Sequence, residues 1–336
     1  MDNLALLVGN ISIYWHGVFM ALAIALAVIV SFIMQSAFQD TQKNDLLNCI
    51  LLSMPLGFVF SRIVYWSCNS EEYETFADHL NFSRGGYALY GAIIGALISA
   101  AIIKKINSRF NAGAVCDCMA AGAALGIVVG RLSAYFSGDN IGLVIKSEKL
   151  HFFPLTVYNA QKEDWVIAVF SFEAFFSLVI FAVLCVLFSR NSNEKTGMKA
   201  KHGDIALLFL LMHGCSQGLF DSMHVDALLV PGNSFVRLQQ ILGAVFFTTV
   251  MIIFAVRSKK KNGFMWYQVI CPLIAVAAVG VTLWMELDRI SYHNFIRNYS
   301  IIFISMLSVV ISGLFIYNTT LNDDTAYEFN NQRRKG

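Results

Sequence analysis

The chain has 336 residues, of which 57% are hydrophobic and only 14% are charged, and its mean hydropathy is +0.61. This composition excludes an ordinary soluble globular domain. The formal net charge of +2 gives no basis for nucleic-acid binding, and no basic module with interleaved aromatic residues is present. The sequence therefore predicts a membrane-embedded protein that does not bind nucleic acid.

Nine apolar stretches are each long enough to cross a hydrocarbon core about 30 Å thick. In chain order they cover residues 14–37, 46–67, 87–106, 113–136, 166–189, 203–223, 235–256, 268–287 and 299–318. The first stretch lacks a basic flank before it and a small-residue cleavage site after it, so we expect a retained helix and not a signal peptide. The predicted fold class is an all-α polytopic bundle of about nine transmembrane helices.

The basic residues of the connecting loops predict the orientation of this bundle. Alternate loops, starting with 38–45 and ending with 319–336, hold fifteen of the 24 Lys and Arg residues, whereas the opposite set of loops holds six. Loops rich in Lys and Arg stay in the cytoplasm. We therefore expect the N-terminus outside and the C-terminus in the cytoplasm.

Five charged residues lie inside the apolar stretches or at their ends: Arg62, Arg131, Glu173, Asp221 and Arg237. In the predicted topology all five fall towards the outer leaflet. A charge at the centre of a membrane helix costs roughly 2.5–3.5 kcal/mol on insertion scales, so such residues indicate a function. Because the guanidinium fork suits phosphate, the sequence predicts a polar cavity for a phospholipid headgroup or another anion. Snorkelling to the interface or structural ion pairs are the alternative.

Other polar residues are expected to have simpler roles. Asp117 and Asp204 lie at inner helix ends and are expected to be interfacial, and Glu286 is expected in a solvated outer loop. Neither the seven cysteines nor the pair His202 and His213 has the spacing of a metal site. We therefore expect no metal site.

Residues 130–142, GRLSAYFSGDNIG, resemble the signature of prolipoprotein diacylglyceryl transferases, which reads roughly GRxGNFxNGExxG. Five further segments resemble motifs of that family in the same order: YWHG at 14–17, SRIVY at 61–65, RGGYALYG at 84–91, FE at 172–173 and QIL at 240–242. The family has seven spans with the N-terminus outside. The resemblance implies a seven-helix membrane domain at 1–257. The last two spans are expected to form an added two-helix hairpin at 258–321, and the polar tail at 322–336 is expected to be disordered in the cytoplasm.

The resemblance also implies an activity. The family transfers a diacylglyceryl group from phosphatidylglycerol, an anionic phospholipid, to the lipobox cysteine in the signal peptide of a prolipoprotein. The reaction takes place at the outer leaflet of the bacterial plasma membrane, and no cofactor is needed. Here the acceptor is either this cysteine or an altered one.

Residue roles follow from the same resemblance. Arg131 matches the family's essential arginine and is assigned to the phosphate, with Arg62 beside it. Asp139 stands where the family has a glutamate, while Glu173 and Gln240 match motif positions. The departures from the family pattern are Ala134 and Ser137 for two asparagines, Tyr90 for a histidine, Gln217 for an arginine and Asp221 for a glutamate.

Two departures look like compensated exchanges. His16 stands where the family has a tyrosine, and Tyr90 stands where it has a histidine. Span 6 has Gln217 in place of an arginine, and span 7 gains Arg237 at the same level of the membrane. Because imidazole titrates near neutral pH, we expect His16 to accept the thiol proton. The alternative is sequence drift after loss of function, with His16 forming a hydrogen bond at the membrane interface. The predicted catalytic residues are Arg131, His16, Tyr90 and Asp139, and the predicted substrate-binding residues are Arg62, Arg237, Glu173, Asp221, Gln217 and Gln240.

Two other function classes compete with this prediction. A non-catalytic protein that binds lipid or joins a membrane assembly would explain the departures from the motifs. A solute transporter is less favoured, because the charges lie on one face and the two halves show no clear inverted repeat.

Overall fold

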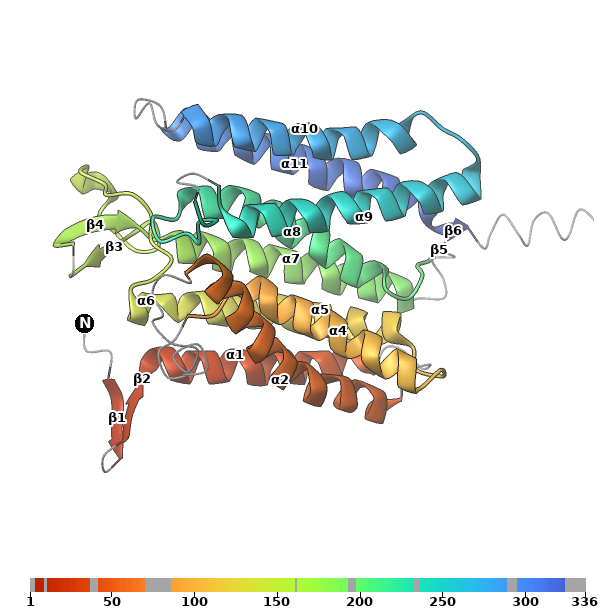
Figure 1. The fold of residues 1–336 in the computed structure, drawn as a ribbon, viewed down its shortest axis with the longest axis horizontal. Coiled ribbons are helices and arrows are strands. Elements are labelled where there is room, and N and C mark those ends of the chain that lie inside the picture. The colour runs from red at the N-terminus through yellow and green to blue at the C-terminus, as the bar shows by residue number, and fades with distance from the viewer. Residues whose placement is uncertain are drawn as a thin grey trace, which may run out of the picture.

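The computed structural model describes residues 4–8, 11–36, 42–69, 86–160, 162–192, 198–232, 236–288 and 295–323. Within these ranges it contains nine helices that are long and apolar enough to cross a membrane. They are α1 (Trp15–Gln35), α2 (Lys43–Cys68), α4 (Leu89–Ile106), α5 (Ala112–Leu132), α7 (Val169–Ser192), α8 (Asp204–Met223), α9 (Leu238–Asn262), α10 (Tyr267–Asp288) and α11 (Phe295–Thr320). Most run alongside one another, with α2 crossing its neighbours obliquely (Figure 1). The predicted polytopic all-α class is confirmed.

Short elements mark the two ends of the bundle. One end carries the short helix α6 (Ala134–Ser137) and two antiparallel hairpins, β1–β2 (Leu4–Val8 and Ile11–Tyr14) and β3–β4 (Thr156–Asn159 and Asp164–Ile167) (Figure 1, left). A single 3₁₀ turn, Glu148–Leu150, precedes β3. We call this the α6 end.

The opposite end, which we call the β5 end, carries the short pair β5 (Met198–Lys199) and β6 (Asn322–Asp323) (Figure 1, right). The tail predicted to be disordered from residue 322 therefore begins with two paired residues. Residues 324–336 lie outside the described part of the chain.

Helix α8 is the central helix of the bundle. In its most apolar stretch 83% of the residues are buried, compared with 17% for α1. It lies between α7 and α9 in Figure 1, and α5 and α11 also pack against it. Because lipid accepts apolar side chains as readily as a protein interior does, the outer helices expose theirs. Polar side chains on α8 must instead find protein partners.

Glycines allow neighbouring helices to approach closely. A Cβ atom on Gly91 of α4 would lie 2.3 Å from the Cα of Ser61 in α2. A Cβ atom on Gly122 of α5 would lie 2.2 Å from the carbonyl oxygen of Ala27 in α1. Small residues spaced four apart commonly form such contacts in lipid. Gly91 and Gly122 therefore allow α4 to pack closely against α2 and α5 to pack closely against α1.

The last two helices pack along the bundle. Helix α11 packs against α8 and α9, and α10 packs against α9. A Cβ atom on Gly218 of α8 would lie 2.8 Å from Met306 of α11, and one on Gly313 of α11 would lie 2.8 Å from Leu211 of α8. The hairpin therefore covers one side of the central helix.

Candidate functional site

The five intramembrane charges all lie at the α6 end of the bundle. Helices α2, α5 and α8 finish there, and α7 and α9 begin there (Figure 1). Arg131 is in the last turn of α5, Asp221 is near the end of α8, and Arg237 is the residue directly before α9. Alternating helix directions thus bring together charges that are far apart in the sequence.

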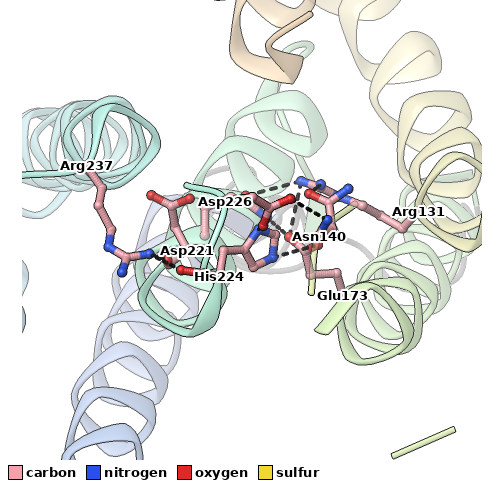
Figure 2. Close-up of polar contacts among 8 residues, drawn as sticks. Arg131, Asn140, Glu173, Asp221, His224, Asp226 and Arg237 are labelled. Atoms are coloured by element: carbon pink, nitrogen blue, oxygen red, sulfur yellow. Dashed lines mark hydrogen bonds and ion pairs between the residues drawn. The ribbon is translucent and has the colours of Figure 1, made fainter. Parts of the chain in front are cut away.

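Arg131 and Glu173 form the central ion pair. Arg131 Nη2 lies 3.1 Å from Glu173 Oε1, and the two side chains are 12% and 1% exposed. Gln217 Nε2 donates to the same carboxylate oxygen at 3.0 Å, and its Oε1 accepts from Arg131 Nη2 at 3.4 Å. Arg131 Nη1 donates to Asn140 Oδ1 at 3.0 Å (Figure 2). Charge-assisted bonds of this kind hold a guanidinium in a fixed orientation.

A histidine supports the ion pair from the other side. His224 is 2% exposed, and its Nε2 lies 3.3 Å from Glu173 Oε2 (Figure 2). Its Nδ1 lies 3.9 Å from Asp226 Oδ1, and Asp226 Oδ2 accepts from the backbone N–H of Asn140 at 2.7 Å. Sequence reasoning missed His224, Asp226 and Asn140. Their positions could have indicated them, because His224 and Asp226 directly follow the predicted span 203–223 and Asn140 directly follows Asp139.

Arg237 approaches the cluster from the side opposite Arg131, with His224 between them in Figure 2. It is 7% exposed and does not face lipid. Its Nη1 donates to the carbonyl oxygens of Asp221 and His224, the latter at 2.9 Å. A cation at the C-terminus of a helix satisfies carbonyls that have no partner within the helix. Arg237 therefore caps the C-terminus of α8.

Glu286 was expected in a solvated loop, and this expectation is wrong. It lies in α10, is 5% exposed, and accepts from Gln240 Nε2 at 3.0 Å. It also lies 3.8 Å from Arg237 Nε. Gln240 Nε2 is 2.7 Å from Ser222 Oγ as well, so this residue of the QIL motif joins α8, α9 and α10.

Several buried polar atoms in the described structure have no hydrogen-bond partner. They include the Tyr90 hydroxyl, both ring nitrogens of His213 and both carboxylate oxygens of Asp221, on side chains about 1% exposed. The Tyr90 ring centre lies 5.7 Å from that of His213, and a Cβ atom on Gly243 would lie 2.8 Å from the Tyr90 hydroxyl. An unpaired buried polar group costs about 1–3 kcal/mol, so such groups call for a functional explanation.

His16 lies at the start of α1, beside the end of α5. It is half-buried, and its Nδ1 is 3.3 Å from the carbonyl oxygen of Ser133, two residues after Arg131. Because a carbonyl only accepts, this bond requires the proton on Nδ1 and leaves the lone pair on Nε2. His16 is therefore able to accept a proton.

Arg62 and Asp139 are the last two predicted site residues. Arg62 is 5% exposed and donates to the carbonyl oxygen of Gly86 at 3.0 Å, with its guanidinium carbon 5.9 Å from the Tyr87 ring centre. Asp139 is exposed, and the side chain that contacts Arg131 is that of its neighbour Asn140. Within the described ranges, no three His, Cys, Asp or Glu side chains come together as a metal site requires.

Comparisons with known proteins point to one family. A family model described as prolipoprotein diacylglyceryl transferase matches residues 3–257. A phosphatidylglycerol–prolipoprotein diacylglyceryl transferase from Streptococcus suis is 26% identical over 274 residues, covering 80% of this chain and 96% of that protein. Proteins of the same name from Clostridium kluyveri and Clostridioides difficile are each 23% identical, covering 78% and 73% of this chain and 100% and 92% of their own lengths.

Proposed function

The chain belongs to the prolipoprotein diacylglyceryl transferase family, and we propose that it transfers a diacylglyceryl group from phosphatidylglycerol to a cysteine thiol of a prolipoprotein. It is a multi-pass protein of the bacterial inner membrane. The observation that carries the proposal is the buried Arg131–Glu173 pair, held by Gln217 and Asn140 at one end of the bundle. We further propose that this end faces the outer leaflet, where a lipobox cysteine is presented by a signal peptide.

The proposed reaction is a displacement at a glycerol carbon. The thiol sulfur forms a bond to this carbon while the carbon–oxygen bond to the phosphate breaks, and glycerol phosphate leaves with the electron pair. Arg131 would stabilise the negative charge that grows on the phosphate, because a guanidinium binds phosphate oxygens with two parallel N–H donors. Glu173 and Gln217 would keep the guanidinium in place, so that little reorganisation is needed.

The thiol proton needs an acceptor, and we assign this role to His16. The bond from Nδ1 to the Ser133 carbonyl leaves Nε2 able to take the proton. His16 is only half-buried, so a substrate can reach it, unlike the fully buried His213. Tyr90 and Asp139 would help to orient the acceptor, and Arg62 would bind the phosphate together with Arg131.

The remaining predicted residues would shape the site around these groups. Arg237 donates to the backbone carbonyl oxygen of Asp221, so the Asp221 carboxylate would balance the charge of this arginine. Gln240 would keep the ends of α8 and α9 together through Ser222. In this proposal Glu173, Asp221 and Gln217 act largely by holding the arginines in place.

A direct test uses the purified full-length chain in vesicles that contain phosphatidylglycerol with labelled acyl chains. A lipobox peptide should gain a diacylglyceryl thioether, detected as a mass increase, and the same peptide with serine in place of cysteine should not. Vesicles of phosphatidylethanolamine alone should give no product. Absence of product, with a reference transferase active in the same vesicles, would contradict the proposal.

A second candidate function is lipid binding without transfer. The observation that favours it is Tyr90, which stands at the family's histidine position and is buried without a hydrogen-bond partner for its hydroxyl. In the same vesicles this alternative predicts saturable binding of phosphatidylglycerol and no thioether. The two functions are thus separated by one measurement.

A further inference from the structure

The α10–α11 hairpin lies outside the region that matches the family. The match ends at residue 257, and the Clostridium kluyveri relative is covered over its whole length by 78% of this chain. Both helices of the hairpin nevertheless reach the polar cluster at the α6 end. Glu286 comes from α10, and Tyr299 comes from α11.

The hairpin makes polar contacts with both helices that enclose the site on this side. Glu286 Oε1 accepts from Gln240 Nε2 at 3.0 Å and lies 3.8 Å from Arg237 Nε. The Tyr299 hydroxyl donates to the carbonyl oxygen of Ser222 at 3.3 Å. The end of α8 and the start of α9 are thus tied to the hairpin.

Glu286 lies where a carboxylate is costly to bury. It is 5% exposed, one turn after Thr282 in a helix that is otherwise almost entirely apolar as far as Leu287. A buried carboxylate is tolerated when it is paired and hydrogen-bonded, and removal of its partner is strongly unfavourable. The contacts with Arg237 and Gln240 therefore help to stabilise the Glu286 carboxylate at this position.

The contacts of Arg237 connect Glu286 with the central ion pair. Arg237 holds the carbonyl oxygens of Asp221 and His224. His224 in turn lies 3.3 Å from Glu173, which pairs with Arg131 at 3.1 Å. An unbroken series of polar contacts thus runs from the hairpin to the residue assigned to the phosphate.

We infer that the hairpin completes the site and that Glu286 is a positioning residue for the reaction. Its carboxylate fixes Arg237 on the C-terminus of α8, and Arg237 fixes the backbone of His224 behind Glu173. The inference rests on the proposed function for its activity readout. It adds that this chain depends on helices beyond its family domain to hold the site in shape.

The test compares two variants of the full-length chain in phosphatidylglycerol vesicles. Glu286→Gln removes the charge and keeps the size. Thr282→Val, one turn earlier, is the matched control, because this residue is equally buried and its hydroxyl donates to Ala278 of its own helix at 2.9 Å. We expect Glu286→Gln to lower kcat on the order of 10-fold with the KM for phosphatidylglycerol within about twofold, and Glu286→Asp to recover part of the loss. Thr282→Val should behave like the wild type.

A kcat for Glu286→Gln equal to that of Thr282→Val would overturn the inference. So would a loss of kcat that Glu286→Asp shares in full, since a shorter carboxylate still carries the charge. If Glu286→Gln does not fold, Tyr299→Phe replaces it, because this change removes the hairpin's bond to Ser222 without altering any buried charge. It should lower kcat by about twofold to threefold, and no change would count against the hairpin's role.

Thermal unfolding separates this inference from the proposed function. A double-mutant cycle with Arg237→Gln and Glu286→Gln needs no catalytic activity. The melting temperature of the double variant should lie above the value expected from the sum of the two single losses. A wild type that fails to transfer lipid would refute the function alone, whereas additive losses in this cycle would refute the positioning role.

Discussion

The two ends of α8 both bury charges, but they treat those charges differently. At the β5 end, Asp117 of α5 accepts from the backbone N–H groups of Gly203 at 2.7 Å and Ala206 at 2.8 Å. Asp204 accepts from the Lys201 N–H at 3.0 Å and pairs with Arg257. Asp117 and Asp204 lie near the starts of α5 and α8, at the helix ends expected from the sequence, and each is 1% exposed.

Asp117 caps the N-terminus of α8, and at the α6 end a residue of opposite charge caps its C-terminus. Arg237 binds the last carbonyls of α8, just as Asp117 binds its first N–H groups. Both arrangements match the helix dipole. Nearby, however, the Asp221 carboxylate and the Tyr90 hydroxyl are buried without hydrogen-bond partners in the described structure.

The difference teaches that burial of a charge does not by itself mark a functional site in a membrane bundle. The Asp117 carboxylate has both oxygens bonded to backbone, which is the arrangement expected of a structural cap. The α6 end keeps polar atoms unpaired at a cost to stability. Variants at the two ends should therefore affect different measured quantities.

The largest effect is expected from the arginine of the central ion pair. Arg131→Gln should lower transfer by about 10²–10³-fold, because it removes the guanidinium that we propose stabilises the leaving phosphate. The matched change at the β5 end, Arg257→Gln, breaks the pair with Asp204 and should lower the melting temperature while transfer per folded molecule stays near that of the wild type. Equal losses of transfer in both variants would remove the functional distinction between the ends.

A somewhat smaller effect is expected from the proton acceptor. His16→Gln should lower transfer by about 10²-fold, since the amide cannot take up the thiol proton. The control is His151→Gln, because His151 also binds a backbone carbonyl, that of Ile145 at 2.8 Å, and lies outside the proposed machinery. Initial rates with a lipobox peptide measure both variants. Full activity of His16→Gln would move the acceptor role to another residue of the α6 end.

Asp221 at the α6 end and Asp117 at the β5 end can be compared by the same small change, aspartate to asparagine. Asp221→Asn should lower transfer on the order of 10-fold with little change in melting temperature, because its carboxylate has no hydrogen bond to lose. Asp117→Asn should lower the free energy of unfolding by about 1–3 kcal/mol, because an amide can accept only one of the two N–H bonds. Its transfer rate per folded molecule should not change. A loss of stability in Asp221→Asn together with a loss of transfer in Asp117→Asn would contradict the assignment of function to the α6 end.

The membrane spans were predictable because their cause is local. An apolar run about as long as the hydrocarbon core is thick can only cross it as a helix, so the predicted span 14–37 corresponds to α1, Trp15–Gln35. Helix ends were less predictable. Helix α9 continues through its lysines to Asn262, beyond the predicted end at 256, because backbone hydrogen bonding does not stop where the apolar run stops.

The sequence by itself also determined that the five charges lie at one end, because successive spans reverse direction and each charge lies near a span terminus. Only the tertiary structure decided which side chains meet. Asn140 contacts Arg131 where its neighbour Asp139 is exposed, His224 supports Glu173 from beyond a span, and Glu286 reaches Arg237 from a helix outside the family domain. Such contacts depend on how each helix is rotated and how closely it packs, and residue spacing along one chain does not encode either.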